Sequence, residues 1–204
     1  MLEHVPRWLG HWLRGVRAGH AGLIAVQPGI VTTAQQLALS SPAFADGARL
    51  PERFTADGDG VSPPLLWDAP PDGTAAFALV VEDADAPAPH PLVHAILWRI
   101  DPGERRLPEG ALSDATEAAG GIVGRNSFLA RGWLPPDPPT GHGSHDYVFQ
   151  LFALDELKDI GDAPGRSDVL GALQGHVIAT GILTGTYSRG ETMPLSPGAQ
   201  AVPT

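Results

Sequence analysis

Three short apolar runs constrain the fold of this chain more than any other feature. They span residues 77–81, 92–100 and 147–154. In an extended strand, neighbouring side chains point to opposite faces, so a run without regular polar alternation is apolar on both faces. Strands of this kind are buried on both sides and lie in a central sheet that other layers cover. The pattern therefore predicts a mainly β protein.

The composition fits one globular domain and excludes several classes of function. The chain has 204 residues, of which 25 are glycine and 21 are proline, so turns are frequent and long helices do not dominate. A formal net charge of −10 disfavours non-specific binding to nucleic acid. Cysteine is absent from the sequence, which excludes disulfides, thiolate catalysis and cysteine-based zinc sites.

The N-terminal segment, residues 2–16, has apolar side chains at helical spacing with arginines between them. We expect an amphipathic helix that packs on its own domain or, in a homodimer, on a second copy; a membrane-surface helix is the alternative. Residues 18–33 have weak periodicity and are interpreted as a connector. The sequence contains neither a run of roughly 20 apolar residues nor a clean signal peptide, so we expect a cytoplasmic protein without integral membrane association.

Capping signals predict one helix near the C-terminus. Ser167 and Asp168 suit the N-cap and the first turn of a helix that extends through Val177. Gly181 is expected to end this helix, and residues 182–187 are expected to form the last strand.

Ionisable side chains interrupt the apolar runs at a few positions. Asp83 and Asp85 follow the first run, His94 lies within the second, and His145 and Tyr147 open the third. Alternation places the imidazole of His145 and the phenol of Tyr147 on the same strand face. A strand core is a costly environment for such groups unless they face a partner or a pocket. Each residue alone has an ordinary interpretation in a core or a turn, but together they indicate a binding site.

Other chemistries have weaker support. Asp85, His94, His142 and His145 could supply nitrogen and oxygen ligands to zinc, but no HExxH motif is present. Ser144 adjoins His145, but the sequence lacks the G-x-S-x-G elbow of serine hydrolases. We therefore expect neither a metal nor a catalytic nucleophile.

Six sequence blocks occur here in the order and form of one known family. The blocks are DGDGVSPPLLW at 57–67, DADAP at 83–87, VH at 93–94, GRNSF at 124–128, HDYVF at 145–149 and GHVIATGILTGTYSR at 175–189. Together they resemble the phosphatidylethanolamine-binding protein family, also called Raf kinase inhibitor-like proteins. The resemblance runs from about Leu39 to Arg189 and covers most of the chain.

The resemblance implies a fold and a pocket. The fold is a large, mostly antiparallel sheet packed on a smaller sheet, with peripheral helices. The pocket binds a small anion through four residues, Asp83, His94, His145 and Tyr147. With the neighbouring acid and the prolines of the rim, the expected ligand-binding residues are Asp83, Asp85, Pro87, His94, Pro138, Pro139, His145 and Tyr147. Imidazole N–H and phenol O–H groups donate to phosphate oxygens, and no cofactor is implied.

Three positions depart from the family pattern. Asp146 stands where the family usually has arginine, Pro135 where the rim loop usually has glycine, and Ala84 where the family has the proline of DPDAP. A further carboxylate at the mouth disfavours phosphate, and proline lacks the N–H that glycine could donate. We expect these changes to affect headgroup affinity more than the fold.

The expected organisation is an N-terminal helix and connector over residues 1–38, a family-like domain over 39–190 and a loose tail over 191–204. The implied function is binding of a small phosphate-containing or other anionic ligand. The main alternative is an inhibitor of a kinase or serine protease that acts through an exposed loop, and the third is a hydrolase that depends on His145. Ala86–Pro87 is also a candidate for a cis peptide bond, because unusual backbone conformations gather at functional sites.

Overall fold

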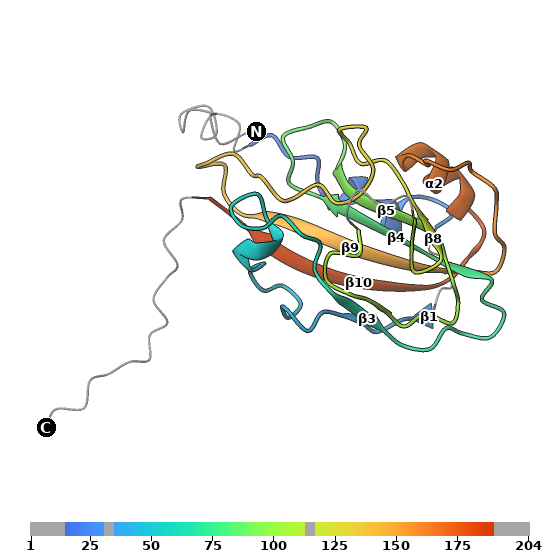
Figure 1. The fold of residues 1–204 in the computed structure, drawn as a ribbon. Helices are drawn as coiled ribbons and strands as arrows, with labels where there is room; N and C mark the ends of the chain where they lie inside the picture. The colour runs from blue at the N-terminus through green and yellow to red at the C-terminus, as the bar shows by residue number, and fades with distance from the viewer. Residues whose placement is uncertain (1–14, 31–34, 113–116, 190–204) are drawn as a thin grey trace, which may run out of the picture.

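Two β-sheets form the framework of the protein (Figure 1). The computed structural model describes residues 15–30, 35–112 and 117–189. The strands are β1 (Gln35–Gln36), β2 (Leu39–Ser40), β3 (Leu65–Trp67), β4 (Ala76–Asp83), β5 (Leu92–Ile100), β6 (Arg106–Leu107), β7 (Glu117–Ala118), β8 (Gly121–Val123), β9 (His145–Leu154) and β10 (Val177–Tyr187). The helical segments are the 3₁₀ turns η1 (His20–Gly22), η2 (Ile24–Val26) and η3 (Glu52–Phe54) and the α-helix α2 (Arg166–Leu173).

The large sheet has seven strands in the order β1-β10-β9-β4-β5-β8-β7, and the small sheet has three in the order β2-β3-β6. All neighbouring strands are antiparallel except β1 and β10, which are parallel. This arrangement confirms the prediction of a large, mostly antiparallel sheet with a smaller one. The three apolar runs of the sequence become β4, β5 and β9, which lie side by side at the centre.

One face of the large sheet packs on the small sheet. Phe77, Leu79 and Val81 of β4 belong to one buried cluster together with Leu65 and Trp67 of β3. The spacing of two residues along β4 is the alternation expected of a strand. Removing this apolar surface from water stabilises the fold by roughly 25 cal/mol per Å².

The opposite face is covered by α2 and by the N-terminal segment of residues 20–30. Ala78 and Val80 of β4 belong to a second buried cluster with Leu173 of α2 and Ile24 of the segment. Figure 1 shows α2 on the side of the large sheet away from β3. Because both faces are covered, all eight residues of β4 are buried, as its apolar pattern predicts.

The described part of the predicted connector, residues 18–30, is a packing element, so that prediction is wrong. The backbone N–H of Ile24 donates to the carboxylate of Glu82 over 2.8 Å, and the N–H of Ala25 donates to Gln150 Oε1 over 2.7 Å. Ile24, Glu82 and Gln150 are each 0% exposed. Turns as short as η1 and η2 have no extended periodicity, which is why the sequence pattern does not reveal them.

Two further predictions are an amphipathic N-terminal helix and a chain without a membrane-spanning helix. Most of the predicted amphipathic helix, residues 2–14, lies outside the described residues, and so does the proposed dimer contact through it. Within the described residues, no helix is long and apolar enough to cross a membrane. Among the described residues of the N-terminal segment, Ile24, Ala25 and Ile30 pack in the second buried cluster.

The C-terminal helix is shorter than predicted. It ends at Leu173, and Gly175 follows with a φ of 79°, a left-handed conformation that glycine adopts readily. Val177, expected in the helix, begins β10 instead, and Gly181 lies inside that strand. A side chain at Gly181 would meet the carbonyl oxygen of Leu37 at 3.0 Å, so this glycine permits close strand approach and does not end a helix.

The turn that follows β4, next to the predicted site, contains only trans peptide bonds. Cis peptide bonds are absent from the described residues, so the candidate cis bond at Ala86–Pro87 is not formed. The turn after β4 is made with trans bonds: the N–H of Ala88 donates to the carbonyl of Ala86 over 2.8 Å.

Candidate functional site

Strand register brings the four predicted pocket residues together. Asp83 is paired with Tyr147 across β4 and β9, and β5, which carries His94, lies on the other side of β4. His145 Nδ1 lies 2.8 Å from Asp83 Oδ2. The ring of His94 meets that of Tyr147 edge to face, with centroids 5.0 Å apart, and the rings of His145 and Tyr147 stack at 6.3 Å. The four side chains converge as expected, while their role in ligand binding stays a prediction.

A chain of polar groups connects two histidines to Asp83. His142 Nδ1 lies 2.7 Å from His145 Nε2, and His142 is 0% exposed. The Asp83 carboxylate accepts from Nδ1–H of His145, so in a neutral His145 ring Nε2 accepts from Nδ1–H of His142. His142 was predicted only as a possible zinc ligand, and its contact with His145 was not predicted. The signal available in the sequence is GHGSH, in which a glycine turn separates two histidines by three positions.

The pKa values of His94 and Tyr147 are shifted in opposite directions. Burial lowers the pKa of the His94 imidazole, although Asp83 nearby opposes this effect, and Nδ1 donates to the carbonyl of Leu134 over 2.6 Å. Burial raises the pKa of the Tyr147 phenol well above its ordinary value, and the charge of Asp83 raises it further. At neutral pH, His94 is therefore neutral and Tyr147 retains its proton as a potential donor.

The lowered pKa of His94 predicts acid sensitivity of the fold. The pKa of His94 is about 6.5 in the unfolded chain and lower in the folded protein. At pH values between these two, the unfolded chain therefore binds a proton at His94 more readily than the folded protein does. The free energy of unfolding should therefore fall as pH drops below 6.5, with His94 contributing at most about 1.4 kcal/mol per pH unit. Urea unfolding at pH 7.5, 6 and 5 measures the slope, and His94→Gln should reduce it. Equal slopes in both proteins would contradict this assignment.

The hydroxyl of Tyr147 is an unusual feature of the cluster. It is buried, and it makes no hydrogen bond to any part of the chain that the structure describes. Only two other buried side-chain atoms of the described residues share this condition, Trp67 Nε1 and Thr180 Oγ1, and neither belongs to the histidine cluster. A buried polar group of this kind usually has a partner, so the hydroxyl beside His94 and Asp83 is a candidate for contact with a ligand.

The rim of the cluster is built by residues after β4 and before β9. Asp85 is 9% exposed; its carboxylate accepts from the N–H of Asp146 over 2.7 Å and from the guanidinium of Arg17. Ser144 also receives a hydrogen bond from Arg17, at its carbonyl oxygen. Arg17 was not among the predicted site residues, because it lies 68 positions before Asp85 in the chain.

The predicted proline residues lie in the loops that follow β4 and precede β9. Pro138 and Pro139 are buried, and the carbonyl of Pro139 accepts from the N–H of His142 over 3.0 Å. Asp137 in the same loop pairs with Arg189, which also binds Asp57. Pro87 is partly exposed in the turn after β4. The proline loop is thus tied to the body of the protein on the side of β10.

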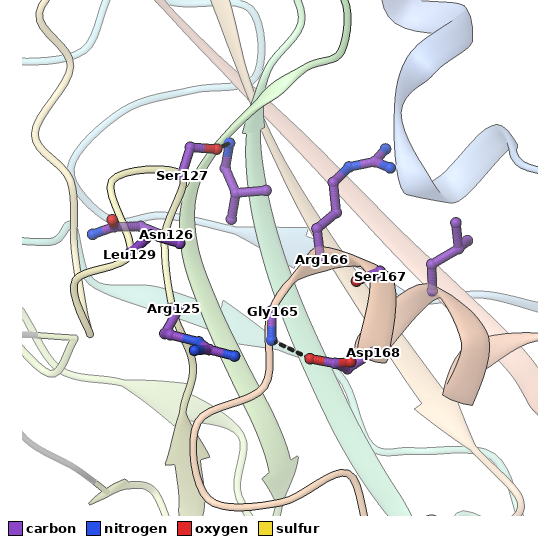
Figure 2. A pocket seen from close by; sticks show the side chains of 10 residues that line it. Arg125, Asn126, Ser127, Leu129, Gly165, Arg166, Ser167 and Asp168 are labelled. Atoms are coloured by element: carbon purple, nitrogen blue, oxygen red, sulfur yellow. Dashed lines mark hydrogen bonds between the residues drawn. The ribbon is translucent and has the colours of Figure 1, made fainter.

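A cavity of about 440 Å³ lies apart from this cluster, between the loop after β8 and the start of α2 (Figure 2). Arg125, Ser127 and Leu129 from the loop face Ser167 and Asp168 of the helix across it. Arg125 at this cavity is exposed, unlike the ionisable groups of the histidine cluster, which are almost fully buried. We place the candidate site at the cluster, because it combines burial, shifted pKa values and an unpartnered hydroxyl.

Metal binding has no geometric support in the described residues: no three histidine, aspartate or glutamate side chains among them are grouped to hold an ion. The contacts of Asp85, His94, His142 and His145 also point to hydrogen bonding, since each has a protein partner at hydrogen-bond distance.

The sequence profile of the phosphatidylethanolamine-binding protein family matches residues 40–188 of this chain. The chain belongs to that family. A UPF0098 protein of Methanothermobacter thermautotrophicus is 37% identical over 152 residues, which are 74% of this chain and 99% of the relative. A UPF0098 protein of Mycobacterium tuberculosis is 41% identical over 133 residues, 65% of this chain and 61% of that relative.

Solved structures agree with this membership. A crystal structure of a phosphatidylethanolamine-binding protein homologue from Chlamydia trachomatis superimposes with a TM-score of 0.69 at 31% identity, and it covers 76% of this chain and 99% of its own. The family profile begins at residue 40, so residues 15–30 lie before the part that defines a phosphatidylethanolamine-binding protein. Arg17, which reaches the rim of the cluster, belongs to this preceding part.

Proposed function

We propose that this phosphatidylethanolamine-binding family member binds a small anion, phosphate or a phosphate-bearing group, at Asp83, His94, His145 and Tyr147. The observation that supports this most is the buried Tyr147 hydroxyl without a partner among the described residues. An unsatisfied buried donor costs about 1–3 kcal/mol, and a ligand oxygen that accepts from it removes that cost. Family membership and the convergence of the four groups support the same function.

The cluster offers donors suited to phosphate oxygens. Tyr147 retains its O–H because its pKa is raised, and His94 gains a second N–H when it is protonated. Asp83 accepts from Nδ1–H of His145 and so fixes the orientation of that ring beside the phenol. All four residues are at most 5% exposed, so a ligand that reaches the phenol must displace side chains at the rim.

Tyr147→Phe tests this function directly. Removing the hydroxyl should weaken binding of inorganic phosphate by about 5- to 10-fold, the equivalent of one hydrogen bond of roughly 1–1.5 kcal/mol. Without ligand, the free energy of unfolding should stay the same or rise by up to about 1 kcal/mol, because the variant no longer buries an unsatisfied group. Titration calorimetry measures the affinity, and urea unfolding measures the stability.

Thr180→Val is a matched control for this experiment. Its hydroxyl oxygen is also buried without a partner among the described residues, but Thr180 lies on β10 opposite Phe152, away from the histidines. The control should share the stability effect and leave phosphate affinity unchanged. A Tyr147→Phe protein that loses stability but keeps its affinity would show that the hydroxyl has a structural role only.

A second candidate function is inhibition of an enzyme through an exposed loop. Phe128 and Leu129 are 60% and 78% exposed, and Leu129 has a φ of 62°, which is unusual for a residue other than glycine. The loop borders the cavity of Figure 2, so an inserted partner side chain would find space beside it. Protease or kinase inhibition that survives Tyr147→Phe would favour this function, because that variant leaves the loop intact.

A further inference from the structure

Arg17 lies on the rim of the candidate site in a segment that precedes the family-matched region. The N–H of Ala18 donates to the carbonyl of Ala86 over 3.0 Å, and the N–H of Gly19 donates to that of Ala84 over 2.7 Å. These two bonds hold the segment against the turn that follows β4. The turn carries Asp85, so the guanidinium of Arg17 is placed beside the Asp85 carboxylate.

The guanidinium lies against the turn that leads into β9. Its Nη1 donates to the Ser144 carbonyl over 3.0 Å, and its Nη2 lies 3.5 Å from the carbonyl oxygen of His142. A side chain at Gly143 would approach Nη2 to 3.2 Å, and Gly143 has a φ of 109°, so glycine both forms this turn and leaves room for the arginine. The side chain of Arg17 is 34% exposed, which leaves part of it open to solvent.

Arg17 places a positive charge beside several carboxylates of the candidate site. Asp83, Asp85 and Asp146 bring three carboxylates to the cluster and its rim, and Asp146 pairs with His20 at 3.2 Å. Carboxylates repel an incoming phosphate, and an arginine fork is the side chain best suited to pair with phosphate oxygens. Asp146 adds a carboxylate next to His145 on β9, so Arg17 supplies in space a positive charge that the strand itself lacks.

We propose that Arg17 is a ligand-contacting residue of this site, which pairs directly with the phosphate group of the bound anion. This inference rests on the proposed function. The N–H groups of Ala18 and Gly19, which follow Arg17, hold the segment in place through the carbonyls of Ala86 and Ala84. The planar guanidinium of Arg17 has five N–H donors, and its contacts with Asp85, Ser144 and His142 leave some of them for a ligand.

The test is calorimetric titration of the full-length protein with inorganic phosphate and, separately, with glycerophosphoethanolamine. Arg17→Ala should weaken binding at least about tenfold, the loss typical of one charge-assisted hydrogen bond, and Arg17→Lys should fall between. Arg125→Ala is the matched control, because it removes an exposed arginine at the other cavity and changes the net charge equally. Stronger loss with one probe than with the other distinguishes a headgroup from free phosphate.

A double variant separates direct contact from simple neutralisation of Asp85. If Arg17 pairs with the anion, Arg17→Ala combined with Asp85→Asn should stay several-fold weaker than Asp85→Asn alone. Equal affinity of these two proteins would overturn the inference, since Arg17 would then act only on Asp85. Tighter binding by Arg17→Ala than by the wild type would also overturn it, because the arginine would then block the site.

Failure of the proposed function has a different signature. A wild-type protein that binds neither probe removes the proposed function and this inference together. A wild-type protein that binds while Arg17→Ala binds equally well removes only the role of Arg17. Urea unfolding of each variant accompanies the titrations, and Arg17→Ala should lower stability by no more than a partly exposed ion pair contributes.

Discussion

Arg166→Ala is expected to lower the free energy of unfolding by about 3–5 kcal/mol, because it leaves a buried carboxylate without its cation. Glu82 is 0% exposed at the centre of the large sheet, and Arg166 Nε donates to it over 2.7 Å. Arg166 binds Oε1 of Glu82, and Oε2 of Glu82 accepts from Gln150 Nε2 over 2.7 Å and from the N–H of Ile24 over 2.8 Å. These neutral donors cannot replace the charge of the guanidinium, so urea unfolding should show a large loss.

Two comparisons isolate the cause. Arg125→Ala removes an exposed arginine from the opposite wall of the cavity beside Arg166, and we expect a change within about 0.5 kcal/mol. Adding Glu82→Gln to Arg166→Ala removes the stranded charge and should recover part of the loss. A full loss in the double variant would show that packing of the arginine side chain, and not its charge, stabilises this part of the fold.

Ile24→Ala is expected to cost about 2–5 kcal/mol, the range for a fully buried isoleucine whose removal leaves a cavity. Ile24 is 0% exposed and packs with Val80, Phe152 and Leu173 in the second core cluster. The effect would be as large as for a residue of the central strands, although Ile24 precedes the family-matched region. Thermal or urea unfolding measures it.

Val26 is the matched control for Ile24. Both residues lie in the same 3₁₀ turn, but Val26 is 59% exposed, so Val26→Ala should change stability by less than about 0.5 kcal/mol. Similar small effects of both substitutions would mean that the N-terminal segment is held loosely in solution and does not belong to the core.

The central strands and the cluster were predictable because both leave a local mark in the sequence. Apolar runs that lack alternation indicate strands buried on both faces, and β4 is such a strand. Ionisable residues within such runs are costly unless they have partners, which singled out His94, His145 and Tyr147. The helix boundary near Gly181 was wrong because glycine ends helices and also permits close strand approach, and the sequence does not distinguish the two.

The sequence by itself determined the mainly β class, the central strands and the residue types of the site, because these depend on period and polarity within a few positions. Only the tertiary structure decided that Arg17 reaches Asp85 and that Glu82 meets Arg166, contacts that span 68 and 84 positions of the chain. Such pairs leave no local pattern, since their distance is set by strand register and by how residues 20–30 pack. The pairing of Asp85 with Arg17 and of Glu82 with Arg166 is therefore set by the fold.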